Sequence, residues 1–219
     1  MVPLSFTGEM FQAHADGALF WPRRGALLVA DLHLEKASFF GRFGQFLPPH
    51  DSIETLERVE RVIRQSGARA VWCLGDSFHD RDGGGRLSTQ ARDMLRELTA
   101  RCDWVWITGN HDPIDVAPVG GNVMPEAMVD GICLRHQALP GERRPEISGH
   151  WHPKLKIRAR GHAIRRRCFV RSANRLVLPA FGALTGGMRA DDPALLQAVG
   201  TPAEALVVSA DQLMRFNLS

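Results

Sequence analysis

The chain has 219 residues, a length that fits one domain with a sizeable hydrophobic core. Hydrophobic residues make up 44% of the sequence and charged residues 23%, which excludes collagen-like and intrinsically disordered proteins. The net charge of +3 indicates no partner class by itself, and no apolar run approaches the ~20 residues that a membrane helix needs.

The first half of the chain predicts a hairpin followed by buried strands. Residues 4–21 alternate loosely between apolar and polar side chains and turn at Asp16-Gly17, as hairpins do. Short continuous apolar runs further along are typical of buried strands. These runs lie at residues 26–30, 70–74 and 104–107.

Two helices are expected between these strands. The first begins at Asp51, which can form a capping box with Glu54, and ends at Gly67. The second begins near Ser88. Both have apolar residues at helical spacing on one face. Strands that alternate with helices predict a parallel sheet.

The second half of the chain predicts short strands joined by loops. One short helix is expected at Pro193–Val199, and residues 205–216 fit one or two final strands. The other expected strands lie at residues 132–135, 146–148, 167–171 and 176–178. No linker divides the chain, so we expect a single α/β domain, residues 1–219, with two sheets.

Five segments that carry His or Asp follow the strand-like runs. They are Asp31-Leu32-His33, Gly75-Asp76, Gly109-Asn110-His111-Asp112, His136, and Gly149-His150-Trp151-His152. Ligands of parallel sheets bind beyond the carboxyl ends of the strands, so we expect these segments to meet at one rim. Two residues that are two positions apart, such as Asp31 and His33, would point the same way if the backbone were extended.

This combination of side chains predicts a centre with two metal ions. Imidazole and carboxylate together suit Mn, Fe or Zn, and the carboxylate of Asp76 can bridge two ions. Ions ~3.5–4 Å apart activate a shared water as hydroxide for in-line attack on phosphorus. A histidine that binds neither ion can protonate the leaving oxygen. Of the remaining histidines, we expect His79 beside the ligands and the others, His14, His50 and His162, on the surface or in loops.

The order of the five segments resembles the calcineurin-like metallophosphoesterases, over a stretch from about Leu28 to His152. The resemblance implies an α/β (α+β) fold, a four-layer α/β/β/α sandwich with two mixed β-sheets flanked by helices. The fourth segment, Arg135-His136-Gln137, departs from the family pattern because it lacks the glycine that often follows this histidine. His136 is nevertheless the only histidine between the third and fifth segments.

The resemblance also implies a role for each residue. Asp76 would bridge the two metals, His111 would protonate the leaving group or stabilise the transition state, and Asp112 would orient His111. The other ligands would be Asp31, His33 and His152 on one metal, and Asn110, His136 and His150 on the second.

A narrower resemblance covers more of the chain. The segment from Asp31 to Gly44, the turn at Pro48-Pro49 and the segment Leu178–Gly187 together resemble the bacterial DNA-ligase-associated metallophosphoesterases. This subgroup is proposed to act as DNA-repair nucleases. Because residues 178–187 follow the metal segments, we expect them to form a glycine-rich loop near the site.

Basic residues gather beside the later histidines. Residues 135–175 contain twelve Lys or Arg and two acidic residues, a net charge of +10, whereas the rest of the chain carries −7. On a strand, one charged face would hold Lys154, Lys156, Arg158 and Arg160. Such a face suits an extended polyanion, because counterion release drives binding. The stretch offers little base stacking, since its aromatic residues are Trp151 and Phe169.

These features predict a metal-dependent phosphodiesterase, a nuclease that acts on DNA in repair. We expect two Mn²⁺ ions, with Fe, Zn or Ni as alternatives, and DNA-repair proteins as further partners. Two other functions stay open: a small-molecule nucleotide phosphodiesterase or phosphomonoesterase, and a non-catalytic metal-binding scaffold in a repair complex.

Location and assembly follow from other features. The first residues do not resemble a signal peptide, and no two cysteines form a CxxC pair, so we expect a cytoplasmic protein with reduced thiols and no membrane partner. Apolar residues from Phe39 to Leu47 either line a homodimer interface or cover the core.

Overall fold

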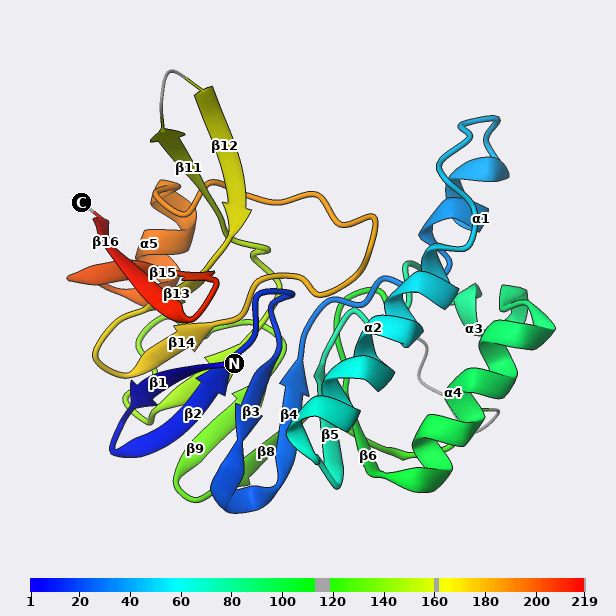
Figure 1. The fold of residues 1–219 in the computed structure, drawn as a ribbon, viewed down its shortest axis with the longest axis horizontal. Coiled ribbons are helices and arrows are strands. Elements are labelled where there is room, and N and C mark those ends of the chain that lie inside the picture. The colour runs from blue at the N-terminus through cyan, green and yellow to red at the C-terminus, as the bar shows by residue number, and fades with distance from the viewer. Residues whose placement is uncertain (113–118, 160–161, 219) are drawn as a thin grey trace.

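Two mixed β-sheets lie at the centre of the molecule (Figure 1). The computed structural model describes residues 1–112, 119–159 and 162–218, without the side chains of residues 158, 159 and 162. The described strands are β1 (Val2–Phe6), β2 (Glu9–Ala13), β3 (Leu19–Trp21), β4 (Ala26–Val29), β5 (Ala70–Leu74), β6 (Asp103–Ile107), β7 (Asn122–Met124), β8 (Glu126–Val129), β9 (Ile132–Arg135), β10 (Glu146–Ser148), β11 (Lys154–Ala159), β12 (His162–Arg167), β13 (Phe169–Arg171), β14 (Arg175–Val177), β15 (Ala203–Ser209) and β16 (Gln212–Leu218). The described helices are the 3₁₀-helix η1 (Pro22–Arg24) and the α-helices α1 (Lys36–Gly41), α2 (Asp51–Ser66), α3 (Gly83–Arg86), α4 (Thr89–Arg101) and α5 (Pro193–Val199).

The first sheet has the strand order β1-β2-β3-β4-β5-β6-β7. Strands β4 to β7 run parallel, as predicted for the first half, and β1 to β4 pair antiparallel. The predicted turn at Asp16-Gly17 joins β2 to β3, but the sequence analysis missed a second hairpin. Its turn is Thr7-Gly8, where both residues have positive φ, and it joins β1 to β2.

Both faces of the first sheet are buried, which explains its continuous apolar strands. In β4, Leu27 and Val29 pack into the cluster that contains the apolar residues of α2 and α4. Leu28 and Ala30 pack into the cluster that the two sheets share. Successive strand residues point to opposite faces, so a strand covered on both sides needs apolar residues at every position.

The observed ends of α2 and α4 agree only in part with those predicted from the sequence. The capping box predicted at Asp51 is wrong: Asp51 is already helical, and its Oδ2 accepts a hydrogen bond from the backbone N–H of Ala37 at 3.1 Å. The first turn of α2 therefore holds the start of α1. The end of α2 at Gly67, which has φ 68°, is as predicted. So is the start of α4, where the hydroxyl of Ser88 accepts from the N–H of Ala91 at 3.2 Å.

The second sheet has the order β16-β15-β13-β14-β10-β9-β8 and packs its inner face against the first sheet. Its outer face buries Val170 and Val177 against Leu195 and Val199 of α5. Helices α2 and α4, two sheets and α5 thus form four layers. The predicted α/β/β/α sandwich is confirmed.

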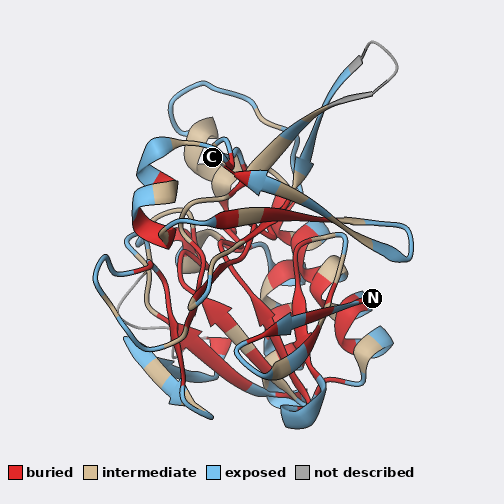
Figure 2. Ribbon diagram, turned by 90° about the vertical axis from the view of Figure 1, so that its left-hand side faces the viewer, coloured by how far each residue is buried: buried red, intermediate tan, exposed pale blue. Residues whose placement is uncertain are grey.

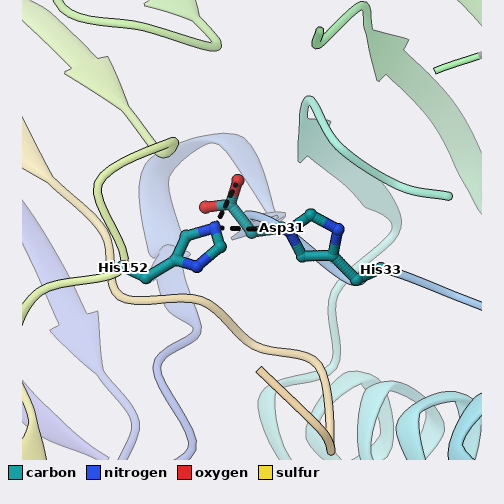
Figure 3. A group of neighbouring side chains, drawn as sticks. All are labelled: Asp31, His33 and His152. Carbon is teal, nitrogen blue, oxygen red and sulfur yellow. Dashed lines mark hydrogen bonds and ion pairs between the residues drawn. The ribbon is translucent and has the colours of Figure 1, made fainter. Parts of the chain in front are cut away.

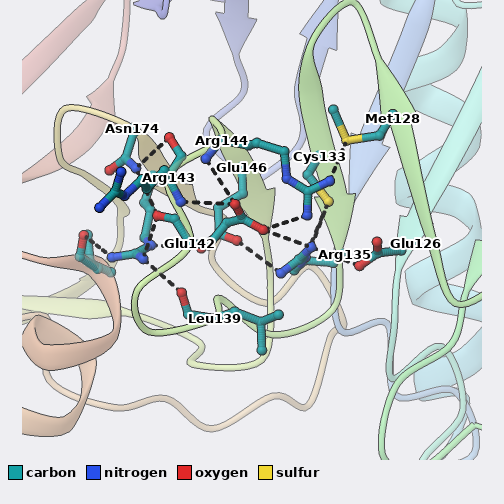
Figure 4. A network of polar contacts seen from close by, with 12 residues as sticks. Glu126, Met128, Cys133, Arg135, Leu139, Glu142, Arg143, Arg144, Glu146 and Asn174 are labelled. Atoms are coloured by element: carbon teal, nitrogen blue, oxygen red, sulfur yellow. Dashed lines mark hydrogen bonds and ion pairs between the residues drawn. The ribbon is translucent and has the colours of Figure 1, made fainter.

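A buried ion-pair network joins strands of the second sheet (Figure 4). Glu146, which is fully buried, accepts from Arg175 Nε at 2.8 Å and lies 3.5 Å from Arg135 Nη1. Arg135 also donates to Glu126 at 2.8 Å and lies 3.7 Å from Glu142. A buried charge that lost its partner would be costly, so these residues fix the ends of β9, β10 and β14. They are interior structural residues, not part of an exposed basic face.

Three differences from the sequence analysis have physical causes. Strands β7 and β8 were not expected, because they are mostly exposed and lack an apolar pattern. Helix α3 forms in a glycine run that favours a turn, and its Arg86 pairs with Asp80. The strand predicted at residues 167–171 is two strands, since the chain leaves β12 at the buried Cys168 and enters the second sheet at β13. No break signal such as Gly or Pro marks this change.

Two segments project from the body on the same side of the molecule (Figure 1). One is the β11–β12 hairpin, and the other is α1 with the following residues 42–49, hereafter the α1 arm. Figure 2 shows that buried residues gather in the two sheets, whereas the hairpin is largely exposed. Within the described ranges, none of the helices has the length and apolar character to cross a membrane.

Candidate metal centre

The five segments singled out in the sequence meet at one rim. Asp31 follows β4, Asp76 follows β5, and Asn110 follows β6, so the carboxyl ends of three adjacent parallel strands deliver them. His136 directly follows β9, and the His150 segment follows β10, from the facing second sheet. The rim is therefore built by both sheets.

Asp31, His33 and His152 form the first candidate metal group (Figure 3). His152 Nε2 lies 3.3 Å from Asp31 Oδ1 and 3.3 Å from His33 Nε2. The backbone N–H of His150 donates to both carboxylate oxygens of Asp31, at 3.2 and 3.0 Å, which fixes the carboxylate in place. Asp31 and His33 are buried, while His152 is half-buried.

Asp76, His136 and His150 form the second candidate group. His136 Nε2 lies 3.5 Å from Asp76 Oδ2 and 3.1 Å from His150 Nδ1. The amide of Asn110 lies 3.4 Å from His150 Nδ1 and extends this group toward solvent. Asp76 also lies 3.9 Å from His33 Nε2, so its carboxylate stands between the two groups.

Five of the seven candidate donor residues have a left-handed backbone conformation. Positive φ values of 54°, 46°, 47°, 72° and 46° occur at Asp31, His33, Asp76, His150 and His152. The extended backbone expected for these pairs is therefore wrong, although the side chains do converge. Residues other than glycine adopt this region at a cost of about 1 kcal/mol each, and such strain gathers at functional sites.

Two glycines of the motifs make room for the donors. A Cβ on Gly75, which has φ 79°, would collide with the imidazole of His136. A Cβ on Gly109 would collide with the backbone nitrogen and the carboxylate of Asp76. The glycines at these positions therefore permit the close approach of neighbouring loops.

The imidazoles are suited to bind cations. Nδ1 of His136 donates to the carbonyl oxygen of Leu74 at 3.0 Å, which leaves the Nε2 lone pair free for a ligand bond. Burial, together with the neighbouring His152, lowers the pKa of His33 to about 2. Burial, together with His136, also lowers the pKa of His150. Imidazoles and carboxylates that face each other within 4 Å fit divalent cations, which require deprotonated ligands.

His111 lies at the open side of this centre. Its side chain is 52% exposed, and its Nε2 lies 4.0 Å from Asp76 Oδ2. Its backbone N–H donates to Asp76 Oδ1 at 3.0 Å, which ties the loop to the donor. His111 belongs to neither candidate metal group, so its ring is free to meet a ligand.

Asp112 contacts backbone and not the ring of His111. Its carboxylate accepts from the N–H of Phe78 at 3.0 Å and from the N–H of Gly109 at 2.8 Å. Burial raises the pKa of Asp112 to about 6 against these two hydrogen bonds. Among the described contacts, Asp112 holds the loops after β5 and β6 together; its orienting role stays a prediction.

His79 lies beside the donors, as the sequence suggested. Its ring is parallel to that of His111, with 6.0 Å between centroids, and meets His33 edge-on at 5.5 Å. Burial, together with Lys36, lowers its pKa to about 4. Its closest ring neighbour is Phe39, at 4.8 Å, which comes from the α1 arm. No pattern in the sequence signals this contact, because α1 was not expected.

The glycine-rich loop at residues 178–187 lies against the centre, as its position after the metal segments indicated. The N–H of Gly182 donates to the carbonyl of Asp31 at 3.2 Å. Two basic residues at the foot of the β11–β12 hairpin hold the same loop. Lys154 Nζ donates to the carbonyl of Thr185 at 3.0 Å, and Arg167 Nη2 donates to that of Gly182 at 2.7 Å.

The expected basic face is partly present. Lys154 faces Arg167 and Lys156 faces Arg165 across the hairpin, so all four lie on one side of it. Lys154 is half-buried and Lys156 is exposed. Two further predicted members are not placed: Arg160 and the side chain of Arg158 lie outside the described residues. Several other basic residues of the window are paired elsewhere, including Arg135, Arg144, Arg171 and Arg175.

The model of one protein family matches residues 26–142, and its description is calcineurin-like phosphoesterase. The chain belongs to the calcineurin-like phosphoesterase family. The match covers the first four donor segments, from Asp31 to His136. This calcineurin-like phosphoesterase is therefore a metal-dependent hydrolase of phosphate esters, with two candidate metal sites at its rim.

Solved structures include similar chains. The calcineurin-like phosphoesterase described here is 30% identical to the nuclease MPE of Pseudomonas putida, with a TM-score of 0.77 and 98% of each chain covered. It is 14% identical to YfcE, a phosphoesterase from E. coli, with a TM-score of 0.43, covering 89% of this chain and 99% of that one. A search of curated proteins finds no match.

Proposed function

We propose that the protein is a metal-dependent phosphodiesterase that cleaves nucleic acid, as a nuclease acting on DNA in repair. The observation that carries the proposal is the pair of adjacent three-residue donor groups, in which Asp76 of the second group lies 3.9 Å from His33 of the first, beside the exposed ring of His111. A 30% identical chain of matching length is described as a nuclease, which supports a nucleic-acid substrate. The resemblance to ligase-associated phosphoesterases supports the role in repair.

The donors divide into two sets. Asp31, His33 and His152 would hold one ion, and His136 and His150, with Asn110, would hold the second. Asp76 would contribute to both, because its Oδ2 lies 3.5 Å from His136 Nε2 and 3.9 Å from His33 Nε2. Imidazole, carboxylate and amide donors together suit Mn²⁺, our proposed metal, as well as Fe²⁺ or Zn²⁺.

The residues around the donors complete the chemistry. The bound ions would supply a nucleophile at neutral pH by lowering the pKa of water, and would draw charge from the phosphoryl oxygens. His111, exposed and outside both donor groups, would hold a proton on its ring and give it to the leaving oxygen. Asp112 would keep this loop in place through its bonds to Phe78 and Gly109.

The β11–β12 hairpin would bind the phosphates beyond the scissile bond. Its basic residues lie opposite one another, and like charges in direct register are unfavourable unless an anion neutralises them. A hollow of about 460 Å³ is lined by Lys154, Arg165, Arg166 and Arg167, together with the turn between β15 and β16. The foot of the hairpin contacts the loop that holds Asp31, so a strand bound there would continue to the metal centre.

The metal requirement provides the first test. Protein loaded with Mn²⁺ should hydrolyse bis(p-nitrophenyl) phosphate and single-stranded DNA, and EDTA should abolish both activities. Product release is measured by absorbance and by gel, with p-nitrophenyl phosphate as the monoester control. Faster hydrolysis of the monoester than of either diester would favour a phosphomonoesterase. If none of Mn²⁺, Fe²⁺, Zn²⁺ and Ni²⁺ supports hydrolysis, the proposal that this site is catalytic is wrong.

Charge reversal on the hairpin provides the second test. The double variant Lys156→Glu/Arg165→Glu should raise the KM for DNA about ten-fold or more at low salt, and should flatten the salt dependence by roughly one unit of slope per lost phosphate contact. Hydrolysis of bis(p-nitrophenyl) phosphate should not change. The matched control is Arg64→Glu, an exposed residue in the last turn of α2. An unchanged KM for DNA would contradict a role of the hairpin in binding.

A further inference from the structure

A row of aromatic rings leads from the metal centre to the surface. His111, at the open side of the centre, lies parallel to His79, with an interplanar angle of 5°. His79 contacts Phe39 of the α1 arm, with centroids 4.8 Å apart, and Phe39 contacts Phe43 at 5.3 Å. The series His111, His79, Phe39 and Phe43, hereafter the ring row, is thus continuous.

The outer end of the ring row is open to solvent. Phe39 is half-buried, whereas Phe43 is 65% exposed and Phe46, in the same loop, is 90% exposed. Phe43 and Phe46 are the two most exposed of the large hydrophobic side chains recorded over the described part of the chain. An isolated exposed ring needs no explanation, but two on one projecting segment, joined by ring contacts to a catalytic centre, indicate a binding surface.

The arm that carries these rings is anchored at its base. The carboxylate of Asp51 accepts from the N–H of Ala37, and the hydroxyl of Ser52 donates to buried Glu35 at 2.8 Å. Arg86 donates to Ser38 Oγ at 3.0 Å, on the opposite side. These bonds hold the first turn of α1 from two directions. Helix α1 is thus fixed, and Phe43, in the loop that follows it, is tied to the helix end by its N–H, which donates to the carbonyl of Phe40 at 3.0 Å.

The surroundings of the ring row indicate which ligand it fits. Lys36 Nζ lies 6.0 Å from the centroid of Phe40, so a positive charge stands at the inner end of the arm. The basic hairpin projects on the same side of the molecule as the arm, and the metal-centre loops connect to both (Figure 1). A ligand that spans this region needs an anionic backbone and flat apolar groups. An unpaired nucleotide strand has both.

We propose that Phe43, supported by Phe39, forms a stacking subsite for a nucleobase next to the scissile phosphate. This inference rests on the proposed nuclease function. It adds the α1 arm to the basic hairpin as a second surface that binds the nucleic acid. The hairpin binds phosphates and has no exposed aromatic residue among its described side chains, whereas the α1 arm binds the face of a base. Stacking on an aromatic ring does not depend on sequence, because every base has a π-face.

The test combines a ring deletion with a base deletion. Phe43→Ala should lower kcat/KM on a single-stranded oligonucleotide by about ten-fold, the typical loss for one stacked base. The same variant should cause no further loss on oligonucleotides that carry abasic residues next to the cleaved phosphate. Phe43→Trp should retain or improve activity on the normal oligonucleotide. Met10→Ala, a substitution of another exposed apolar residue on β2, is the control and should change nothing.

The outcomes separate this inference from the function on which it rests. If the unmodified protein hydrolyses bis(p-nitrophenyl) phosphate but no oligonucleotide, the nuclease function and the stacking subsite both fail. If it cleaves the oligonucleotide and Phe43→Ala is equally active, only the subsite is overturned. An equal loss on normal and abasic oligonucleotides, with a change in elution on size exclusion, would also overturn it and would assign Phe43 to contact with a second copy.

Discussion

Asp76→Asn will lower the metal content of the protein below that of the unmodified chain and reduce kcat by on the order of 10³-fold. Asp76 belongs to the second group and also faces the first, because its Oδ2 lies 3.5 Å from His136 Nε2 and 3.9 Å from His33 Nε2. An amide has no negative charge, and when its oxygen keeps the bond to the N–H of His111, its NH₂ group takes the place of Oδ2, the atom that faces both groups. The loss should therefore exceed that of a change in either group alone.

Asparagine is the informative replacement at this position. Asp76 has φ 47°, a conformation that Asn adopts more readily than Ala does. The amide oxygen can still accept from the N–H of His111, as Asp76 Oδ1 does at 3.0 Å. A loss of activity then reflects the lost charge and not a collapsed loop.

The measurement is metal content by mass spectrometry of the purified protein, together with kcat on bis(p-nitrophenyl) phosphate over a range of Mn²⁺ concentrations. Asp82→Asn, at an exposed carboxylate on the loop before α3, is the control and should retain metal and activity. If Asp76→Asn retains its full metal content and turnover, Asp76 does not bridge.

The rim could be predicted from the sequence because it follows from strand order. Asp31, Asp76 and Asn110 each come directly after a run that reads as a buried strand, and adjacent parallel strands end at one edge. The convergence of the second sheet at His136 and His150 came from the family resemblance, since no local pattern indicates which loops face each other.

The backbone at the donors could not be predicted. The left-handed conformations of Asp31 and His33 are stabilised by contacts from elsewhere in the chain, such as the bonds of their N–H groups to the carbonyls of Gly75 and Asp76. A local pattern of two-residue spacing favours an extended strand instead. The strain is visible only when the neighbouring loops are in place.

The count of basic residues along the sequence overestimates how many of them are exposed on one face. Arg135 and Arg175 belong to the stretch with a net charge of +10, yet they are buried around Glu146. Linear counting cannot separate such interior pairs from exposed residues such as Lys156. The aromatic residues of the basic stretch are no better guide: Phe169 is buried in the core, while the exposed rings of Phe43 and Phe46 lie in the loop after α1.

His111→Ala will retain the metal content of the unmodified protein and lose most of its turnover on DNA. The ring lies outside both donor groups, so its removal leaves the candidate ligands unchanged. Loss of a positioned acid costs about 10²- to 10⁴-fold in rate when the leaving group needs a proton. An alkoxide that leaves from DNA needs that proton, whereas p-nitrophenolate is stable without one. The loss should therefore be much smaller on bis(p-nitrophenyl) phosphate.

This difference between substrates separates proton donation from other roles of the same ring. If His111 only stabilised charge on the phosphoryl group, its removal would slow both substrates by similar factors, because both pass through the same charged centre. If the ring of His111 only supported the loop through its contact with His79, its removal would displace the backbone N–H that bonds Asp76, and metal content would fall with activity. The control His50→Asn, at an exposed histidine with φ 69° before α2, should leave both rates unchanged. Equal turnover of His111→Ala and the unmodified protein on DNA would show that the leaving group takes its proton from elsewhere.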